Sequence, residues 1–220
     1  MSPSTQLPMH FAPRVSYDPA DYMLGEANRR ATEILGDLHR WPEPVLALIG
    51  PAGSGKTHFI HWLIARHGGC VLDEHSIQAP PPAPLWVLED ITTMKDDAAL
   101  IRLINDCRAG AGRLLLTAPV PPAHITTRTP DLHSRLSALI YVELGAPDEA
   151  MLAAILAKHF SDRQLRVAPE VLTYLVARME RSYAAAARAA TWLDTAAMQS
   201  ARAITLPLAR HYLAAAENNP

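Results

Sequence analysis

Residues 50–57 read Gly-Pro-Ala-Gly-Ser-Gly-Lys-Thr, and this stretch is the most specific motif in the chain. It fits the phosphate-loop pattern G-x-x-x-x-G-K-[ST] at every fixed position. Its glycines allow backbone conformations in which successive N–H groups turn toward an anion. Lys56 can reach the β- and γ-phosphates of a nucleotide, and the Thr57 hydroxyl can ligate Mg²⁺. The candidate nucleotide-binding residues are Gly50, Pro51, Ala52, Gly53, Ser54, Gly55, Lys56, Thr57 and His58.

The residues on either side of this loop support its assignment. Residues 45–49, Val-Leu-Ala-Leu-Ile, form a continuous apolar run of strand length, which is typical of a strand buried on both faces. A helix is expected from about Gly55 to Arg66, ended by two glycines. A glycine-rich turn without a ligand is therefore the weaker interpretation. A serine-hydrolase elbow fails, because Ala52 stands where that motif needs glycine.

The rest of the chain divides into three parts. We expect a flexible arm over residues 1–16, an α/β core over 17–146 and a helical lid over 147–220. Alternation of strands and helices in the core predicts a parallel sheet covered on both faces. The further strands are expected at residues 70–72, 85–88, 113–117 and 139–144, and the further core helices at 21–40, at 95–108 and near Leu132.

Composition narrows the class of protein. Hydrophobic residues make up 49% of the 220 residues, which provides a sizeable core. The net charge of −2 argues against a dedicated DNA-binding domain. The two cysteines do not make a disulfide framework. With no secretory signal and no apolar run of about 20 residues, we expect a soluble, cytoplasmic protein without a membrane segment.

A second acidic element follows residues 85–88, on a strand that we expect beside the strand of the phosphate loop. Glu89 and Asp90 stand at its end, where carboxylates can hold Mg²⁺ together with Thr57 and polarise an attacking water. Solvated charges at a strand end are the plainer alternative. Thr117 ends the next strand at the same edge of the sheet, within reach of the γ-phosphate or that water.

In this order of motifs the sequence resembles the AAA+ ATPases, and within them the DnaA initiator branch. The segment with Tyr17, Asp18 and residues 22–28 is similar to the opening of the DnaA nucleotide domain, where it flanks the adenine. Residues 117–122 resemble the sensor 1 stretch. Residues 132–136 resemble the arginine-finger segment, which makes Arg135 the finger. This resemblance implies an AAA+ core with a small helical lid that binds ADP or ATP with Mg²⁺.

Within that branch the chain is similar to the Hda and HdaA regulators of DnaA. The sequence stops at Pro220, about where the lid should end, so we expect no helix-turn-helix domain and no sequence-specific DNA binding. The arm resembles the peptide that docks Hda on the DNA polymerase sliding clamp. Its candidate anchors are Gln6, Leu7, Met9 and Phe11. The resemblance implies that Arg135 promotes ATP hydrolysis by the initiator DnaA and so limits replication initiation.

Three departures from the family pattern concern hydrolysis by the chain itself. Glu89 stands where the family has Asp, and the finger segment continues as Ser-Ala-Leu over residues 137–139. The second sensor arginine of the lid aligns with residues 183–186, Tyr-Ala-Ala-Ala, with Arg181 and Arg188 as substitutes. We expect weak intrinsic ATPase activity. A stand-alone ATPase resembling the helicase loaders, a small-molecule kinase and a homo-oligomer stay open.

Overall fold

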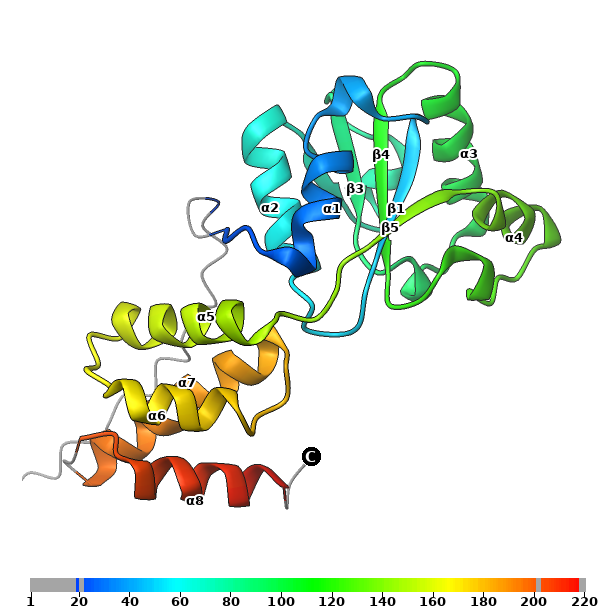
Figure 1. Cartoon of the computed structure of the whole chain (residues 1–220). Helices are drawn as coiled ribbons and strands as arrows, with labels where there is room; N and C mark the ends of the chain where they lie inside the picture. The colour runs from blue at the N-terminus through cyan, green and yellow to red at the C-terminus, as the bar shows by residue number, and fades with distance from the viewer. Residues whose placement is uncertain (1–18, 20–21, 201–202, 218–220) are drawn as a thin grey trace, which may run out of the picture.

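A computed structural model describes residue 19, residues 22–200 and residues 203–217. The core is a parallel sheet of five strands in the order β2-β3-β4-β1-β5 (Figure 1). The strands are β1 (Val45–Ile49), β2 (Cys70–Leu72), β3 (Leu85–Leu88), β4 (Arg113–Ala118) and β5 (Ile140–Glu143). The predicted parallel sheet is confirmed. Its last strand is two residues shorter than expected, and β4 extends one residue past Thr117.

One predicted neighbourhood in the sheet is wrong. The acidic strand β3 does not lie beside β1, because β4 pairs with both and separates them. Leu115 of β4 faces Leu46 of β1 on one side and Val87 of β3 on the other. The residues of β4 from 114 to 116 are fully buried, as a central strand requires. This order places Thr117 between the phosphate loop and the acidic residues.

Helices cover both faces of the sheet. On one face, α1 (Glu26–Leu35) and α2 (Lys56–His67) bury residues such as Leu35 and Phe59 against Leu46 and Leu115. On the other face, α3 (Asp97–Arg108) and α4 (Pro130–Ser137) pack against Ala47 and the rest of that face. Short 3₁₀ segments lie at Leu38–Arg40, Ser76–Gln78, Ile91–Thr93 and Pro122–His124.

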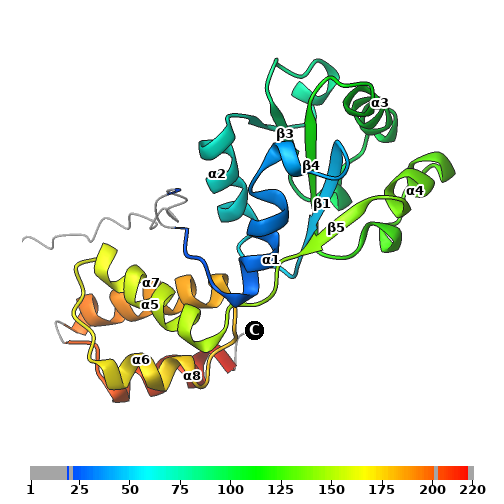
Figure 2. The same cartoon turned by 45° about the horizontal axis from the view of Figure 1, so that its top comes forward.

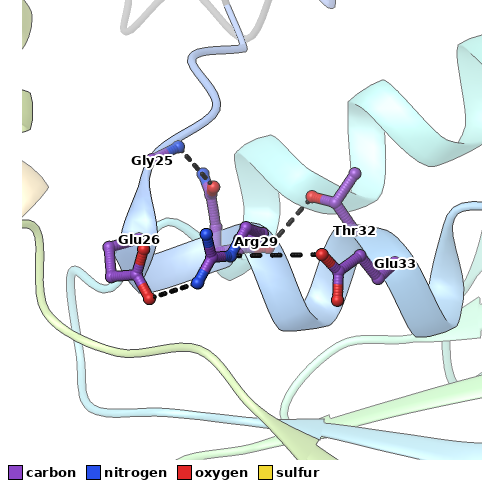
Figure 3. A network of polar contacts seen from close by, with 6 residues as sticks. Gly25, Glu26, Arg29, Thr32 and Glu33 are labelled. Carbon is purple, nitrogen blue, oxygen red and sulfur yellow. Dashed lines mark hydrogen bonds and ion pairs between the residues drawn. The ribbon is translucent and has the colours of Figure 1, made fainter.

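The first helix is shorter than the pattern over residues 21–40 predicts. It begins at Glu26, after the extended Gly25, whose N–H donates to the Asn28 side chain at 2.9 Å. The chain leaves the helix at Gly36 and forms a separate 3₁₀ turn. Figure 3 shows Arg29 between Glu26 and Glu33 on the exposed side, at 2.7 and 4.0 Å. The helical spacing of apolar residues therefore continues past Gly36, although the helix ends before it.

The lid is a bundle of four helices: α5 (Glu149–Asp162), α6 (Pro169–Val176), α7 (Tyr183–Ser200) and α8 (Leu206–Glu217). It has its own apolar core, in which Leu152, Phe160 and Leu193 are almost completely buried. Both views place this bundle at the end of the core near α1 and α2, away from α3 and α4 (Figure 2). Among the residues that the structure describes, no helix is long and apolar enough to cross a membrane.

Candidate functional site

The phosphate loop joins β1 to α2 as the sequence predicts. Gly53 and Gly55 have φ angles of +73° and +91°, which residues with a Cβ rarely adopt. Gly55 is also the N-cap of α2, so the loop ends at the positive end of a helix. This backbone suits an anion at the N-terminus of α2.

Lys56 lies folded across the loop. Its ammonium donates to the carbonyl oxygens of Gly50 and Pro51 at 2.6 and 2.9 Å. Partial burial lowers the pKa of Lys56, and the negative charges of Asp90 and Glu89 act in the opposite direction. The cation is therefore held beside the glycine-rich loop, near both predicted carboxylates.

Thr57 and Glu89 come together, although 32 residues separate them in the sequence. The Thr57 hydroxyl donates to Oε2 of Glu89 at 2.8 Å. A hydroxyl and a carboxylate oxygen are ligands that Mg²⁺ accepts, so these two side chains fit that ion. Within the described ranges no three His, Cys, Asp or Glu side chains cluster as a metal site. The remaining ligands of a bound Mg²⁺ would be waters and phosphate oxygens.

Asp90 points elsewhere. Its backbone has a φ of +46°, and its carboxylate caps the 3₁₀ segment Ile91–Thr93 by accepting from the N–H and the hydroxyl of Thr92. The two predicted carboxylates therefore have different partners. Glu89 accepts a hydrogen bond from Thr57, whereas Asp90 caps the turn after β3. The catalytic and metal roles of Asp90 stay predictions.

Thr117 links two strand ends. It is 2% exposed, and its hydroxyl oxygen accepts from the backbone N–H of Asp90 at 2.9 Å. The side chain therefore sets the conformation of the acidic turn. Its predicted contact with a γ-phosphate or an attacking water stays a prediction.

An aromatic cluster lies at the start of α2. The Tyr22 ring stacks on Trp62 with centroids 5.0 Å apart, and it meets His58 and Phe59 edge-on at 5.7 Å. Burial raises the pKa of the Tyr22 hydroxyl. Tyr22 belongs to the segment that the resemblance places beside the adenine. Its stacking on Trp62 was not predicted, because nothing in the spacing joins residues 40 apart.

The lid reaches the phosphate loop through Tyr183, which sequence reasoning did not select. The N–H of Tyr183 donates to the carbonyl oxygen of Gly53 at 2.8 Å. Arg181 pairs with Glu149 and Arg188 pairs with Glu180, so the two substitute arginines contact lid carboxylates. The alignment of residues 183–186 with a sensor position was the one signal that pointed to this contact.

Arg135 lies on α4, and its side chain is 27% exposed. Its Nε donates to Asp131 at 3.0 Å and its Nη1 donates to Asn105 of α3 at 2.6 Å. Both views show α4 at the opposite end of the molecule from the lid (Figures 1 and 2). The guanidinium is thus held in place away from the lid. Arg128, in the loop before α4, donates to the Lys95 carbonyl oxygen at 2.8 Å and is the next arginine to consider as a finger.

The four arm residues with a predicted docking role, Gln6, Leu7, Met9 and Phe11, lie outside the described residues.

Comparisons with known proteins agree with this architecture. Residues 148–213 match the family model described as "Hda, lid domain". An uncharacterized protein of Haemophilus influenzae is 25% identical over 189 residues, which are 78% of this chain and 82% of that protein.

Solved structures with the same fold include two DnaA proteins. Domain III of the Thermotoga maritima replication initiation protein DnaA matches with a TM-score of 0.73 at 15% identity, over 88% of this chain and 93% of that chain. AMPPCP-bound DnaA from Aquifex aeolicus matches with a TM-score of 0.63 at 16% identity, over 80% of this chain and 64% of that chain. The fold is therefore that of the DnaA-like AAA+ proteins.

Proposed function

We propose that this replication-related protein, which joins a DnaA-like AAA+ fold to an Hda-type lid, binds an adenine nucleotide with Mg²⁺ and regulates the initiator DnaA. In this proposal it docks on the sliding clamp and promotes ATP hydrolysis by DnaA. The observation that carries the proposal is the 2.8 Å contact of Thr57 with Glu89, next to Lys56, in a chain with an Hda-type lid. The contact supports a nucleotide site, and the lid supports a regulatory role.

Nucleotide binding is supported by the charges around the loop. The Lys56 ammonium neutralises phosphate charge, and the N-terminus of α2 adds a positive dipole end. Thr57 and Glu89 would hold Mg²⁺, which offsets the negative charge of the β- and γ-phosphates when it is bound. One DnaA of this fold was solved with AMPPCP, an ATP analogue, and that supports adenine as the base.

Arg135 is proposed to act on the nucleotide of an adjoining DnaA subunit. A guanidinium contacts two oxygens at once and keeps its charge, so it stabilises charge that develops on the transferred phosphoryl group. Such a finger contributes about 10³- to 10⁵-fold in rate. Hydrogen bonds to Asp131 and Asn105 restrict the rotamers of Arg135, so less side-chain entropy is lost on docking.

Weak hydrolysis by the chain itself belongs to the proposal. The lid contacts the phosphate loop by an uncharged tyrosine, while Asp90 closes a turn. The first feature leaves the lid without a cation at the phosphates, and the second occupies a carboxylate that would otherwise polarise an attacking water.

The arm is the proposed clamp-docking element, because a Gln amide with three apolar anchors suits a hydrophobic surface pocket. Changing both Gln6 and Leu7 to Ala should lower clamp affinity by at least about 100-fold, since anchor residues dominate such contacts. Co-sedimentation with the clamp measures this loss. ADP binding should stay at the parent value, and a double variant that still co-sediments would remove the arm from the proposal.

Reconstitution tests the whole proposal. Purified protein, DNA-loaded clamp and ATP-bound DnaA are mixed, and ATP hydrolysis is followed over time. Stimulation that needs all three components supports the proposal. Fast turnover by the isolated protein, either alone or with a small acceptor, would instead favour a stand-alone ATPase or a kinase.

A further inference from the structure

Tyr183, the first residue of α7, contacts the phosphate loop in two ways. Its backbone N–H donates to the Gly53 carbonyl oxygen at 2.8 Å. Its ring lies against Gly55, where an added Cβ would be only 3.1 Å from a ring carbon. The backbone bond fixes the start of α7 on the loop, and the ring covers the residue that caps α2.

The hydroxyl of Tyr183 ties the same residue to two further elements. It donates to the sulfur of Met151 on α5 at 2.9 Å. Burial raises the pKa of this hydroxyl to about 12, and the neighbouring Asn28 side chain acts in the opposite direction. Asn28 is itself buried and bonds to the backbone of Met23 and Gly25 at the entry to α1. Tyr183 therefore joins the loop, the lid and the segment before α1.

Packing around this residue leaves little room. A Cβ added at Gly53 would lie 2.9 Å from the Cβ of Ala184, and one at Gly25 would lie 2.2 Å from a Met151 methyl. Real Cβ atoms do not approach so closely without movement of a neighbour. A small shift of the loop is therefore passed to α7 by contact.

The loop has a reason to shift when it binds an anion. Lys56 donates to the carbonyl oxygens of Gly50 and Pro51 in this structure. An ammonium that turns toward a phosphate leaves those two carbonyls without this donor. Gly53, two residues further along, carries the bond to Tyr183. The carbonyls that Lys56 contacts and the carbonyl that Tyr183 contacts therefore lie on the same short segment, residues 50–53.

We propose that Tyr183 is a latch that holds the lid on the phosphate loop and passes the occupancy of the loop to α7. It is a positioning residue, because it contacts the loop and the lid, and the identity of the anion rests on the proposed function. The latch is uncharged, so it closes without a γ-phosphate. The contribution of Tyr183 to affinity should therefore be the same for ADP and ATP, since a neutral phenol adds no charge contact to the third phosphate.

Hydrogen exchange of the nucleotide-free protein tests the latch without a ligand. In Tyr183→Ala the amides of residues 50–58 should exchange at least about tenfold faster than in the parent, because the loop loses its cover. Tyr174→Ala, on α6 of the lid, is the matched control and should leave this segment unchanged. Equal exchange of residues 50–58 in Tyr183→Ala and the parent would overturn the latch.

Tyr183→Leu guards against a variant that fails to fold. Leucine keeps much of the volume but lacks the planar ring and the hydroxyl. Circular dichroism establishes its fold, after which we expect at least about fivefold faster exchange of residues 50–58. A folded Tyr183→Leu with parental exchange would overturn the proposal as well.

Coupling to α7 is measured by adding ADP. In the parent, ADP should slow exchange of the amides of residues 183–190, and Tyr183→Ala should lose at least half of this protection at saturating ADP. Equal protection in both proteins would overturn the coupling. Failure of the parent to bind ADP would defeat the proposed function, while the nucleotide-free exchange still decides whether Tyr183 holds the loop.

Discussion

The sheet core and the lid differ in how many small side chains they bury. Between the strands and helices of the core, large residues such as Leu46, Leu63 and Leu115 are fully buried. In the lid, α7 instead buries alanines, including Ala186 and Ala189. Small residues let helix axes approach closely. The core is thus packed with large side chains, whereas the lid combines large side chains such as Phe160 with small ones on α7 that let it lie close to α5.

The two regions also differ in what they bring to the site. The core supplies charged groups, Lys56 and Glu89, from its loop and a strand end. The lid supplies a backbone N–H and the uncharged ring of Tyr183. We therefore expect the core to supply the binding chemistry and the lid to act by position. Four changes test this division.

Arg135→Ala, a change on α4 of the α/β core, has the largest expected effect. The variant should lose about 10³- to 10⁵-fold of the stimulated rate of ATP hydrolysis by DnaA, because only a transition-state contact is removed. ADP and clamp binding should stay at parental values. Arg135→Lys should rescue poorly, since an ammonium lacks the planar fork. Full stimulation by Arg135→Ala would move the finger to another arginine, with Arg128 the first to test.

Lys56→Ala comes next, because it removes the cation that the phosphate loop carries. ADP affinity should fall by at least about 100-fold, since charge-assisted bonds to the phosphates are lost. The rise in melting temperature with ADP should disappear, because a ligand stabilises the state that it binds. Lys158→Ala, in the lid, is the matched control and should keep the ADP-induced shift. A parental shift in Lys56→Ala would contradict the phosphate-loop assignment.

Ala189→Leu tests the close packing of the lid. Ala189 is fully buried, so three extra carbons should destabilise the fold by about 1–3 kcal/mol through overpacking. Denaturant unfolding measures the change. Ala187→Leu adds the same atoms two residues earlier at a partly exposed position, and should cost under about 0.5 kcal/mol. Equal costs at the two positions would argue against a lid held by close approach.

Arg181→Ala has the smallest expected effect. Arg181 and Glu149 form an exposed ion pair, with more than half of each side chain accessible, and such pairs contribute about 0–1 kcal/mol. ADP affinity, measured by calorimetry, should change less than twofold. A tenfold loss would show that this arginine reaches the nucleotide, and the lid would then supply charge after all.

Local patterns predicted the parallel sheet and the phosphate loop because their signals lie within a few residues. The eight-residue loop motif and the apolar run of β1 each carry their own evidence. The helix over residues 21–40 was overextended, because its apolar spacing continues through Gly36 while the backbone does not. The placement of β3 beside β1 was wrong, because strand order depends on crossovers that a linear pattern does not contain.

The α/β core, the helical lid and the phosphate-loop residues could be predicted without a structure, because they follow from spacing and residue type over short stretches. Only the tertiary structure brought Thr57 to Glu89, turned Asp90 into a cap and set Tyr183 on Gly53. Each of these contacts joins residues from different elements or depends on one backbone angle. Their geometry is decided when strands take their order in the sheet and the lid packs against the core, so no local pattern encodes it.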